Sequence, residues 1–383
     1  MKNKVFCSAF GISADGNKIW GSAHDFNEIY EADLLSHKMR SLGRLEGEED
    51  YTNLVEYIEY CPDKVVFVPG SNGRYFHVFD LKTAKQTKFP KNKFASKSVK
   101  NDVNRFFSFA WNQKVYVICR DQLCLYSYHS DKDDFEIVFE EDGNTPFKCM
   151  AFSVWDGFVA FLSIELNEIV IYNLSENDVE RIKLDKKMMG INRIAITQNR
   201  IFLYRIEDRM VYLLDRKGTL LKEFSVLAKT QSNIMMFHTE ENAYLIGITK
   251  QAKDIFKIDP NGAVEQLCWE HGEDLNVYCL NRINDILYGY ELASSKNVTG
   301  LYYDAKRCFQ YKLGTNAVHS IEWDTDEIAY EDKLIKMLKE GALLFENSVY
   351  NLEFAFQHIN SKQDYINESH ANVGNRIYNQ LKK

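Results

Sequence analysis

The stretch Ile29-Tyr30-Glu31-Ala32-Asp33 is a short run of apolar and aromatic residues closed by an aspartate, and the chain repeats its pattern. Six further runs of this kind close on Asp, Asn or His, and turn residues and another strand-like run follow each one. The closing residues are Asp33, Asp80, His129, Asn173, Asp215, Asp259 and Asp304. The intervals between them are 47, 49, 44, 42, 44 and 45 residues. A strand-rich unit of about 40 to 50 residues is the size of a propeller blade, so the sequence predicts an all-β, seven-bladed β-propeller.

A second apolar run precedes the closing residue by thirteen positions in five of the seven units. Its middle residues are Trp20, Phe67, Tyr116, Ala160 and Phe202. In the last two units the run is displaced by two or three residues, next to the longer polar turns of 249–254 and 291–299. Because insertions in turns leave the number of strands unchanged, both units still fit the repeat.

The closing residues have a structural interpretation and a functional one. A short Asp or Asn side chain accepts hydrogen bonds from backbone N–H groups two or three positions on, and so holds the turn into the last strand. The sequence Asp259-Pro260-Asn261-Gly262 has the composition of such a turn. Seven acidic or polar residues around a ring, one in each unit, could also suggest metal sites. One turn per blade explains them without metal, and we expect no metal and no cofactor.

The repeat ends before residue 326. We therefore divide the chain into a propeller of residues 1–325 and a short helical C-terminal extension of residues 326–383. In this extension Leu334, Ile335 and Leu338 share a helical face, and Ser348 is a candidate cap for a further helix. Helices this short are marginal alone in water, so we expect them to pack on the propeller or on a partner.

Composition excludes several classes of protein. The 47 Lys and Arg residues against 55 Asp and Glu give a formal charge of −8, which is a poor match for a nucleic-acid binder. No apolar run approaches the ~18 residues that a membrane span needs, and no stretch resembles a secretion signal. The eight cysteines are scattered, mostly within strand-like runs, where a free cysteine behaves as a small apolar residue. We therefore expect reduced thiols and a cytoplasmic location.

Polar residues at the predicted turns and blade connections over the central channel are the candidate ligand-binding residues. They are Asp25, Asn27, Arg74, Arg105, Arg120, Arg193 and Arg205. Several arginines around one opening would suit a carboxylate, a phosphate or an anionic sugar, because the guanidinium fork matches such groups. The alternative is that these are ordinary surface or strand-end arginines, since a sequence pattern does not show convergence.

The connection between the second and third units is long and basic. Its lysines include Lys91, Lys93, Lys97 and Lys100, while Asp102 is its one acidic residue. In an acidic protein this is a local inversion of charge, and long loops often carry function. A solvated loop without a function remains the alternative.

Motifs of catalysis are missing from the sequence. It contains no Gly-x-Ser-x-Gly, no phosphate-binding glycine loop and no His-Glu-x-x-His. His24 and Asp25 are neighbours on one extended stretch, so their side chains would point to opposite faces. Cys119 and Cys124 have no second cysteine pair nearby, which makes zinc a poor interpretation.

Two segments resemble a group of bacterial β-propellers. These are residues 19–30, which read Ile-Trp-Gly-Ser-Ala-His-Asp-Phe-Asn-Glu-Ile-Tyr, and residues 372–378, which read Asn-Val-Gly-Asn-Arg-Ile-Tyr. They are similar to segments of kelch-like or sialidase-like propellers from anaerobic Gram-positive bacteria. The resemblance covers the two ends of the chain and implies the fold, but it carries no catalytic residue. The Trp-Asp pairing of WD repeats and the double glycine of kelch repeats are absent, and Ser13-Ala14-Asp15-Gly16 with Trp20 matches the sialidase Asp-box only in part.

Taken as a whole, the pattern favours a non-catalytic binding or assembly propeller. We expect it to recognise a polar ligand, an anionic one included, or a protein partner over its channel face. The alternative is a propeller enzyme, a hydrolase or lyase, that acts on a glycan or a similar polar substrate. Two carboxylates at catalytic separation would distinguish the enzyme, and a sequence does not reveal that distance.

Overall fold

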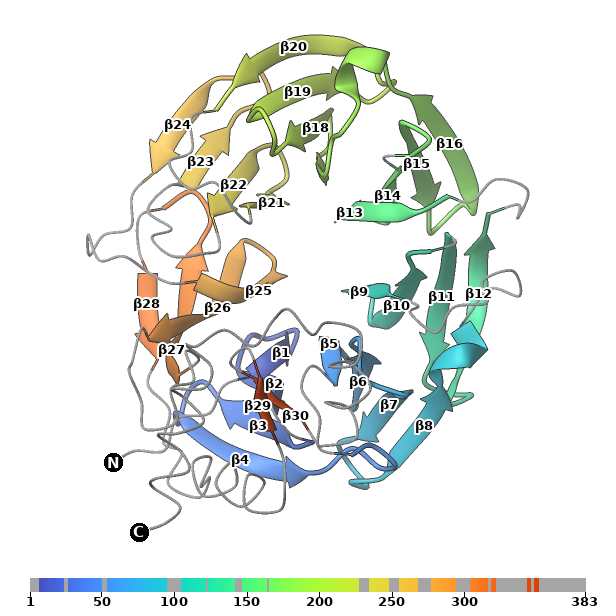
Figure 1. The fold of residues 1–383 in the computed structure, drawn as a ribbon, viewed down its shortest axis with the longest axis vertical. Helices are drawn as coiled ribbons and strands as arrows, with labels where there is room; N and C mark the ends of the chain where they lie inside the picture. Colours follow the sequence, from blue (N-terminus) through green and yellow to red (C-terminus); the bar gives the residue numbers. More distant parts are fainter. Residues whose placement is uncertain are drawn as a thin grey trace. The chain divides into compact units, whose positions relative to one another are not determined.

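The computed structural model describes the strands of the repeat and most of the turns between them. The described residues are 7–23, 27–49, 54–94, 105–121, 123–141, 147–163, 165–226, 234–247, 255–267, 277–293, 304–315, 318–321, 343–345 and 348–350. Among them are seven four-stranded antiparallel sheets, each formed by four strands that are consecutive along the chain. The protein is a seven-bladed β-propeller, as predicted (Figure 1).

The chain divides into two compact units. Unit 1 comprises residues 1–93, 290–308 and 320–383, and unit 2 comprises residues 94–289 and 309–319. Blades 1 and 2 belong to unit 1, and blades 3 to 6 belong to unit 2. Among the described residues, no helix is long and apolar enough to cross a bilayer.

Blades 1 and 2 show how each repeat folds. Blade 1 consists of β1 (Cys7–Ile12), β2 (Lys18–Ala23), β3 (Ile29–Asp33) and β4 (Lys38–Gly43). Blade 2 consists of β5 (Val55–Cys61), β6 (Lys64–Pro69), β7 (Tyr75–Asp80) and β8 (Gln86–Pro90), and the 3-10 helix η1 (Lys91–Phe94) follows it. The second strands, β2 and β6, are buried along almost their whole length. They are buried because other strands and the neighbouring blade cover both of their faces.

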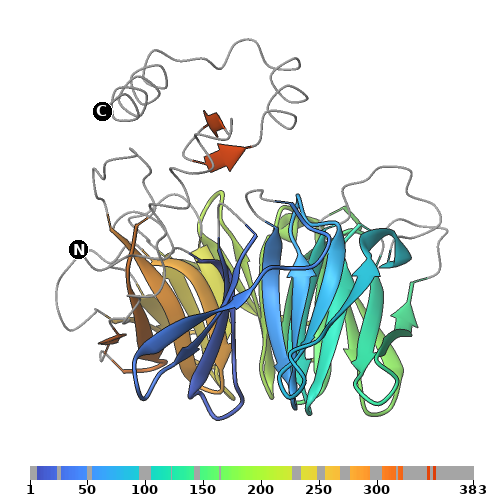
Figure 2. The ribbon, with the colours of Figure 1, turned by 90° about the horizontal axis from the view of Figure 1, so that it is seen from below.

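Unit 2 contains four complete blades. Blade 3 consists of β9 (Phe106–Trp111), β10 (Lys114–Cys119), β11 (Cys124–His129) and β12 (Asp134–Glu140), and blade 4 of β13 (Cys149–Trp155), β14 (Phe158–Ser163), β15 (Glu168–Asn173) and β16 (Asp178–Lys183). Blade 5, preceded by the 3-10 helix η2 (Lys186–Met188), consists of β17 (Arg193–Ile196), β18 (Arg200–Arg205), β19 (Met210–Asp215) and β20 (Leu220–Ser225). Blade 6 consists of β21 (Ile234–His238), β22 (Ala243–Gly247), β23 (Ile255–Ile258) and β24 (Val264–Leu267). The first strand of each blade lies at the inner edge and the fourth at the outer edge (Figure 1), and the turns gather at the two ends of the strands (Figure 2).

Blade 7 and a short hairpin complete the described chain. Blade 7 consists of β25 (Val277–Ile283), β26 (Ile286–Ala293), β27 (Asp304–Lys312) and β28 (Val318–Ile321), and the hairpin pairs β29 (Leu343–Phe345) with β30 (Ser348–Tyr350). The hairpin contradicts the prediction of a helix that starts at Ser348. Phe345, Val349 and Tyr350 are aromatic or β-branched and fit a strand at least as well as a helix. The other helices expected in residues 326–383 lie outside the described residues.

The closing residues make the predicted turns. In Asp33, Asp80 and Asn173 the side-chain Oδ1 accepts the backbone N–H groups two and three positions on, at 2.7–3.3 Å. In Asp215 and Asp259 it accepts the groups two and four positions on, at 2.8–2.9 Å. These N–H donors hold the pKa values of Asp33, Asp80 and Asp215 below the usual range. The structural interpretation of the closing residues is therefore confirmed at five positions.

The seventh closing residue was assigned wrongly. Asp304 does not end the third strand of its blade but begins it, and the strand ends at Lys312. The backbone N–H of Leu313 donates to Asp285 O at 2.8 Å, the bond that the residue after the third strand also makes in blades 1, 2 and 4. Thr315 Oγ1 donates to Lys312 O at 2.8 Å and holds the turn in place of an aspartate. The seventh unit thus carries an insertion before its third strand, which the regular interval to Asp304 concealed.

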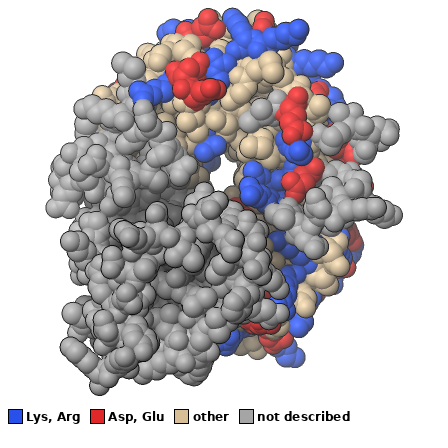
Figure 3. Space-filling model, viewed as in Figure 1, with Lys and Arg blue, Asp and Glu red and all other residues tan. Residues whose placement is uncertain are grey.

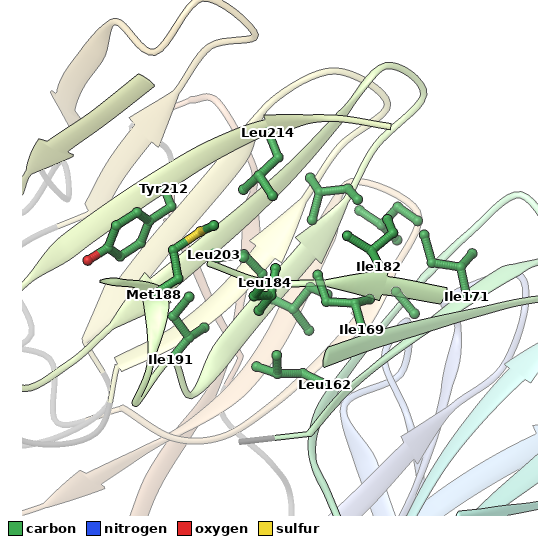
Figure 4. Packing of buried hydrophobic residues seen from close by; sticks show 14 residues of the cluster. Leu162, Ile169, Ile171, Ile182, Leu184, Met188, Ile191, Leu203, Tyr212 and Leu214 are labelled. Carbon is green, nitrogen blue, oxygen red and sulfur yellow. The ribbon is translucent and has the colours of Figure 1, made fainter. Parts of the chain in front are cut away.

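Packing between neighbouring blades forms the core. Between blades 4 and 5, Leu162 and Ile169 pack against Leu203 and Leu214, and all four side chains are fully buried (Figure 4). Burying each such side chain stabilises the fold by about 1.5–3 kcal/mol. In unit 1 the backbones of blades 1 and 2 approach so closely that a Cβ atom on Gly11 would lie 2.6 Å from the carbonyl oxygen of blade 2 residue 58. Glycine is required at this position for contact between the blades.

We expect Asp259→Ala to lower the free energy of unfolding by about 0.5–2 kcal/mol, as the loss of a helix-capping side chain does, because two backbone N–H groups lose their acceptor. Asp259→Asn keeps the acceptor and should stay close to the wild-type value. Urea unfolding of the three proteins measures the difference. Equal stability of the alanine and asparagine variants would contradict the role of the turn.

Candidate functional site

The blade connections and the turns between second and third strands lie on the same face within a blade pair. In unit 1 the backbone N–H of Gly70, which follows β6, donates to the carbonyl oxygen of Leu54, which precedes β5, at 2.8 Å. A Cβ atom on Gly73 would lie 2.3 Å from the same Leu54 oxygen, so the turn can approach the connection only with glycine there. This is the face on which the candidate residues were predicted.

Asn27 fastens the connection between blades 1 and 2. Its side chain is buried, Nδ2 donates to Leu45 O and to Glu48 O at 2.9 Å each, and Oδ1 accepts the Leu45 N–H at 2.7 Å. All three hydrogen bonds join the side-chain amide of Asn27 to backbone atoms of this connection, so the amide has a structural role. The neighbouring candidate, Asp25, lies outside the described residues.

Beside Asn27 lies a buried carboxylate–imidazole pair that the sequence did not suggest. Glu48 Oε1 accepts the backbone N–H groups of Arg74 and Tyr75 at 2.7 and 2.9 Å and lies 3.6 Å from His77 Nε2. The side chains of Glu48 and His77 are 2% and 1% exposed. Among the described residues, no hydrogen-bond partner meets Glu48 Oε2 or either ring nitrogen of His77. The pair has the groups for acid–base chemistry, but a substrate cannot reach it in this conformation.

The candidates of the blade 2 face mostly bond to nearby atoms of unit 1. The guanidinium of Arg74 pairs with Glu49 at 3.3 Å, and both side chains are about half exposed, so solvent screens the attraction. Lys91 Nζ donates to Gly70 O at 2.9 Å, and Lys93 Nζ lies 5.0 Å above the ring centre of Phe89. The remaining candidates of the basic loop, Lys97 and Lys100, lie outside the described residues.

In unit 2 the structure brings two predicted arginines together on blade 3. The backbone N–H of Arg120 donates to Arg105 O at 2.9 Å, so the two residues are neighbours at the same end of the blade. The Arg120 guanidinium lies 4.2 Å from the ring centre of Phe107, and its Nε donates to Cys149 O of blade 4 at 3.3 Å. Within the described chain, the Nη atoms of Arg120 and the guanidinium of the exposed Arg105 have no acceptor. We call Arg105 and Arg120 the arginine pair.

The other two arginines of unit 2 bond to backbone and carboxylate groups. Arg193 Nε donates to Ile234 O of blade 6 at 2.6 Å, as Arg120 does to blade 4. Arg205 Nη1 donates to the carbonyl oxygens of Lys187 and Met189 at 2.8 and 2.9 Å, and its Nε and Nη2 pair with Asp208. Arg205 therefore holds the connection that contains η2, whereas both Nη atoms of Arg120 have no acceptor in the part of the chain that the structure describes.

Cationic and anionic side chains are interspersed over the described part of the surface in Figure 3. A group of three or more His, Cys, Asp or Glu side chains with metal-binding geometry does not occur among the described residues. Cys61, Cys119, Cys124 and Cys149 are buried, and burial raises the pKa of the Cys61, Cys124 and Cys149 thiols to about 12. These thiols are poor nucleophiles at neutral pH because the thiolate is scarce.

Comparison with known proteins supports the fold. No family model matches the sequence, and no curated protein matches it. Virginiamycin B lyase from Staphylococcus aureus is similar in structure, with a TM-score of 0.54 and 12% identity over 76% of this chain and 95% of the lyase. The structure of YCF48 bound to D1 peptide has a TM-score of 0.52 and 9% identity over 75% of this chain and 89% of that one. A chain of the mitotic checkpoint complex has a TM-score of 0.51 and 8% identity over 76% of this chain and 85% of that one.

At these identities the likeness establishes the fold and leaves the function open. The class of protein is therefore a seven-bladed propeller. The arginine pair and the network around Glu48 are its candidate sites.

We expect Asn27→Ala to lower the free energy of unfolding by about 2–4 kcal/mol, because three buried hydrogen bonds of about 0.5–1.5 kcal/mol each are lost. Asn261→Ala, which removes an exposed amide, should change it by less than about 0.5 kcal/mol. Urea unfolding measures both. A small effect at Asn27 would instead favour the predicted role in ligand binding.

We expect His238 to make the protein sensitive to mild acid. Burial, together with the nearby Arg282 charge, lowers the pKa of His238 to about 3, whereas an unfolded histidine titrates near pH ~6.5. The unfolded chain therefore binds the extra proton between these values. The stability contributed by the neutral ring is present above pH ~6.5 and is lost as pH falls, by up to about 1.4 kcal/mol per pH unit. Urea unfolding from pH 7 to pH 4.5 should show a shallower pH dependence for His238→Phe, and parallel curves would contradict this assignment.

Proposed function

We propose that this chain is a non-catalytic binding or assembly propeller that recognises a protein partner through a polar or anionic group on its channel face. The observation that carries the proposal is the state of the Arg120 guanidinium. It lies against the Phe107 ring and bonds to Cys149 O through Nε, and no acceptor among the described residues occupies either Nη atom.

The arginine pair has the properties of a binding anchor. Contact with the Phe107 ring and the bond to Cys149 fix the side chain of Arg120 before a ligand arrives, so little side-chain entropy is lost on binding. Arg105, exposed and adjacent, adds a second charge without a fixed position. Arginine is enriched among the residues that dominate binding energy at protein interfaces. A carboxylate or another oxygen-rich group of the partner would fit the two forks.

Similar structures support a protein as the ligand. YCF48 is bound to D1 peptide, and the mitotic checkpoint complex is an assembly of proteins. Both contain a chain of this fold, so the fold is suited to holding peptide or protein partners. A cytoplasmic location is part of the same proposal, supported by the buried, unoxidised thiols of Cys61, Cys124 and Cys149.

An enzyme is the second candidate. The observation that favours it is the Glu48–His77 pair, because a carboxylate beside an imidazole is a common acid–base arrangement. Such an enzyme would be a hydrolase or lyase acting on a glycan or a similar polar substrate. It ranks second because both side chains are almost fully buried.

The proposal is tested by removing the arginine pair. A tagged full-length chain captures its partner from cells of its source, and the complex is then rebuilt from two purified proteins and measured by calorimetry. Because residues that anchor an interface contribute about 2 kcal/mol or more, we expect Arg105→Gln with Arg120→Gln to weaken binding by at least about tenfold.

Lys132→Gln is the matched control. Lys132 lies on blade 3 in the turn between β11 and β12, at the other end of the blade, and carries the same charge. It should leave the dissociation constant unchanged. A rebuilt complex that tolerates loss of both arginines would contradict the proposal. Turnover of a glycan substrate by the wild-type chain that His77→Ala abolishes would contradict it as well.

A further inference from the structure

A hollow of about 550 Å³ lies between blades 5 and 6 in unit 2. Its charged lining consists of Arg200, Asp215, Arg216, Lys217 and Glu241, and Pro260 forms part of the wall. We call it the blade 5–6 hollow. Arg200 and Arg205 stand at opposite ends of the six-residue strand β18, roughly 17 Å apart at ~3.3 Å per residue. The hollow therefore lies at the opposite end of the blade 5 strands from Arg205.

Hydrogen bonds between the two blades give the hollow a fixed frame. Arg200 Nε donates to Pro260 O at 2.9 Å, and the backbone N–H of Gln198 donates to Glu240 O at 3.2 Å. Lys222 Nζ, also from blade 5, donates to Gly262 O at 2.9 Å. The turns that surround the hollow are thus held by side-chain and backbone bonds before any ligand binds.

Two guanidinium groups in this frame have donors to spare. Arg216 lies 5.1 Å from the ring centre of Phe158 and 5.8 Å from that of Trp155. Its one hydrogen bond to a described residue goes from Nη1 to Thr197 O at 3.3 Å. Arg200 uses Nε and Nη1 on backbone carbonyls and leaves Nη2 without a partner among the described residues. No carboxylate of the described chain lies within 4 Å of either group, whereas Arg40, Arg181 and Arg205 each have one.

Partial burial of the Arg216 guanidinium has an energetic cost, which the more distant Glu180 carboxylate offsets only in part. Burial against the aromatic rings lowers the pKa of its guanidinium, because the charged form is partly removed from water. The electrostatic attraction between an anionic ligand and this partly buried guanidinium is stronger than for an exposed arginine, because less water screens it. Both arginines are half-buried and can still be reached from the hollow.

The two carboxylates of the hollow restrict the ligand. Asp215 is used in its own turn, where Oδ1 accepts two backbone N–H groups, and Glu241 is exposed at the rim. With three cations and two anions the lining has a net charge of +1, so a single carboxylate is favoured over a polyanion such as a nucleic acid. The hollow is also open to solvent, which suits a segment of a larger molecule more than a small ligand that must be largely enclosed.

We propose that the blade 5–6 hollow binds a peptide segment of a partner protein through one carboxylate side chain, held between the guanidinium groups of Arg200 and Arg216. This site is separate from the arginine pair of blade 3. Basic residues on either side of the bound carboxylate would meet Glu241 and Asp215.

Trp155 provides a fluorescent reporter for the site, because its ring lies 5.8 Å from the Arg216 guanidinium. The probe is an acetylated, amidated peptide, Gly-Lys-Ser-Glu-Ser-Lys-Gly, added to the full-length chain at low salt while tryptophan fluorescence is followed. We expect a saturable change that Trp155→Phe removes. We also expect the same peptide with Gln in place of Glu to bind at least fivefold more weakly.

The variants make the assignment specific. Arg200→Gln and Arg216→Gln should each weaken binding at least fivefold, while Lys132→Gln and the double variant Arg105→Gln with Arg120→Gln should bind the peptide as the wild type does. If Arg216→Gln fails to fold, Arg200→Lys and Arg216→Lys replace it, because lysine keeps the charge but lacks the fork.

Three results would overturn the proposal. They are equal affinity for the Glu and Gln peptides, unchanged affinity in the Arg200 and Arg216 variants, and tighter binding of hexaglutamate, sodium acetate or inorganic phosphate than of the single-Glu peptide. None of these outcomes bears on the arginine pair, so this proposal and the proposed function can fail separately.

Discussion

Contact between the faces of neighbouring sheets is the interaction on which this protein depends. A four-stranded blade has two apolar faces and cannot bury either one alone, so each blade is stable only against the next. The shared core of blades 4 and 5 and that of blades 5 and 6 consist mainly of buried Leu, Ile, Val, Phe and Tyr side chains. In unit 1 the same role falls to Trp20, which stacks on Tyr60 of the next blade with ring centres 5.1 Å apart. Close approach of the sheets also explains why a Cβ atom at position 11 has no room.

Polar side chains at the blade ends supplement this packing. Arg120, Arg193 and Arg200 each donate to a backbone carbonyl of the following blade, and Asn27 binds the connection between blades 1 and 2. Such bonds satisfy carbonyl groups at strand ends, where the sheet itself supplies no donor. They also explain why arginines are frequent at these turns without any ligand. The residues that merit attention for binding are those whose donors remain unused after this structural task.

Two sites meet that criterion at opposite ends of the blades of unit 2. Arg120 and Arg216 both lie against aromatic rings. Among the described residues, neither Nη atom of Arg120 and only Nη1 of Arg216 has an acceptor. An aromatic ring beneath a guanidinium fixes its orientation and excludes water from one side, while the other side still accepts hydrogen-bonding partners. The two proposed sites would allow the propeller to hold two peptide segments at once, one at each end of its blades.

The blade number and the second strands could be predicted from the sequence, because a blade repeats its apolar pattern and its Asx turn at nearly constant spacing. Trp20, Phe67 and Phe202 all proved to be buried in second strands. The prediction failed at Asp304, where an insertion shifted the third strand to end at Lys312 while the interval stayed regular. It failed also at Ser348, whose short apolar segment is equally compatible with a helix and with the hairpin that forms.

The candidate site was predictable only as a set of residue types. The sequence placed arginines at turns and blade connections, but hydrogen bonds across the blades determine which guanidinium groups already have an acceptor within the described chain. The Glu48–His77 pair and the Arg200–Arg216 hollow join residues that are far apart in the chain or carry no motif, so no local pattern marks them. Strand formation depends on a local, periodic pattern of apolar residues, and this pattern can be recognised in the sequence. Convergence of side chains from separate turns follows from how the blades pack, and it appears only when the chain is folded.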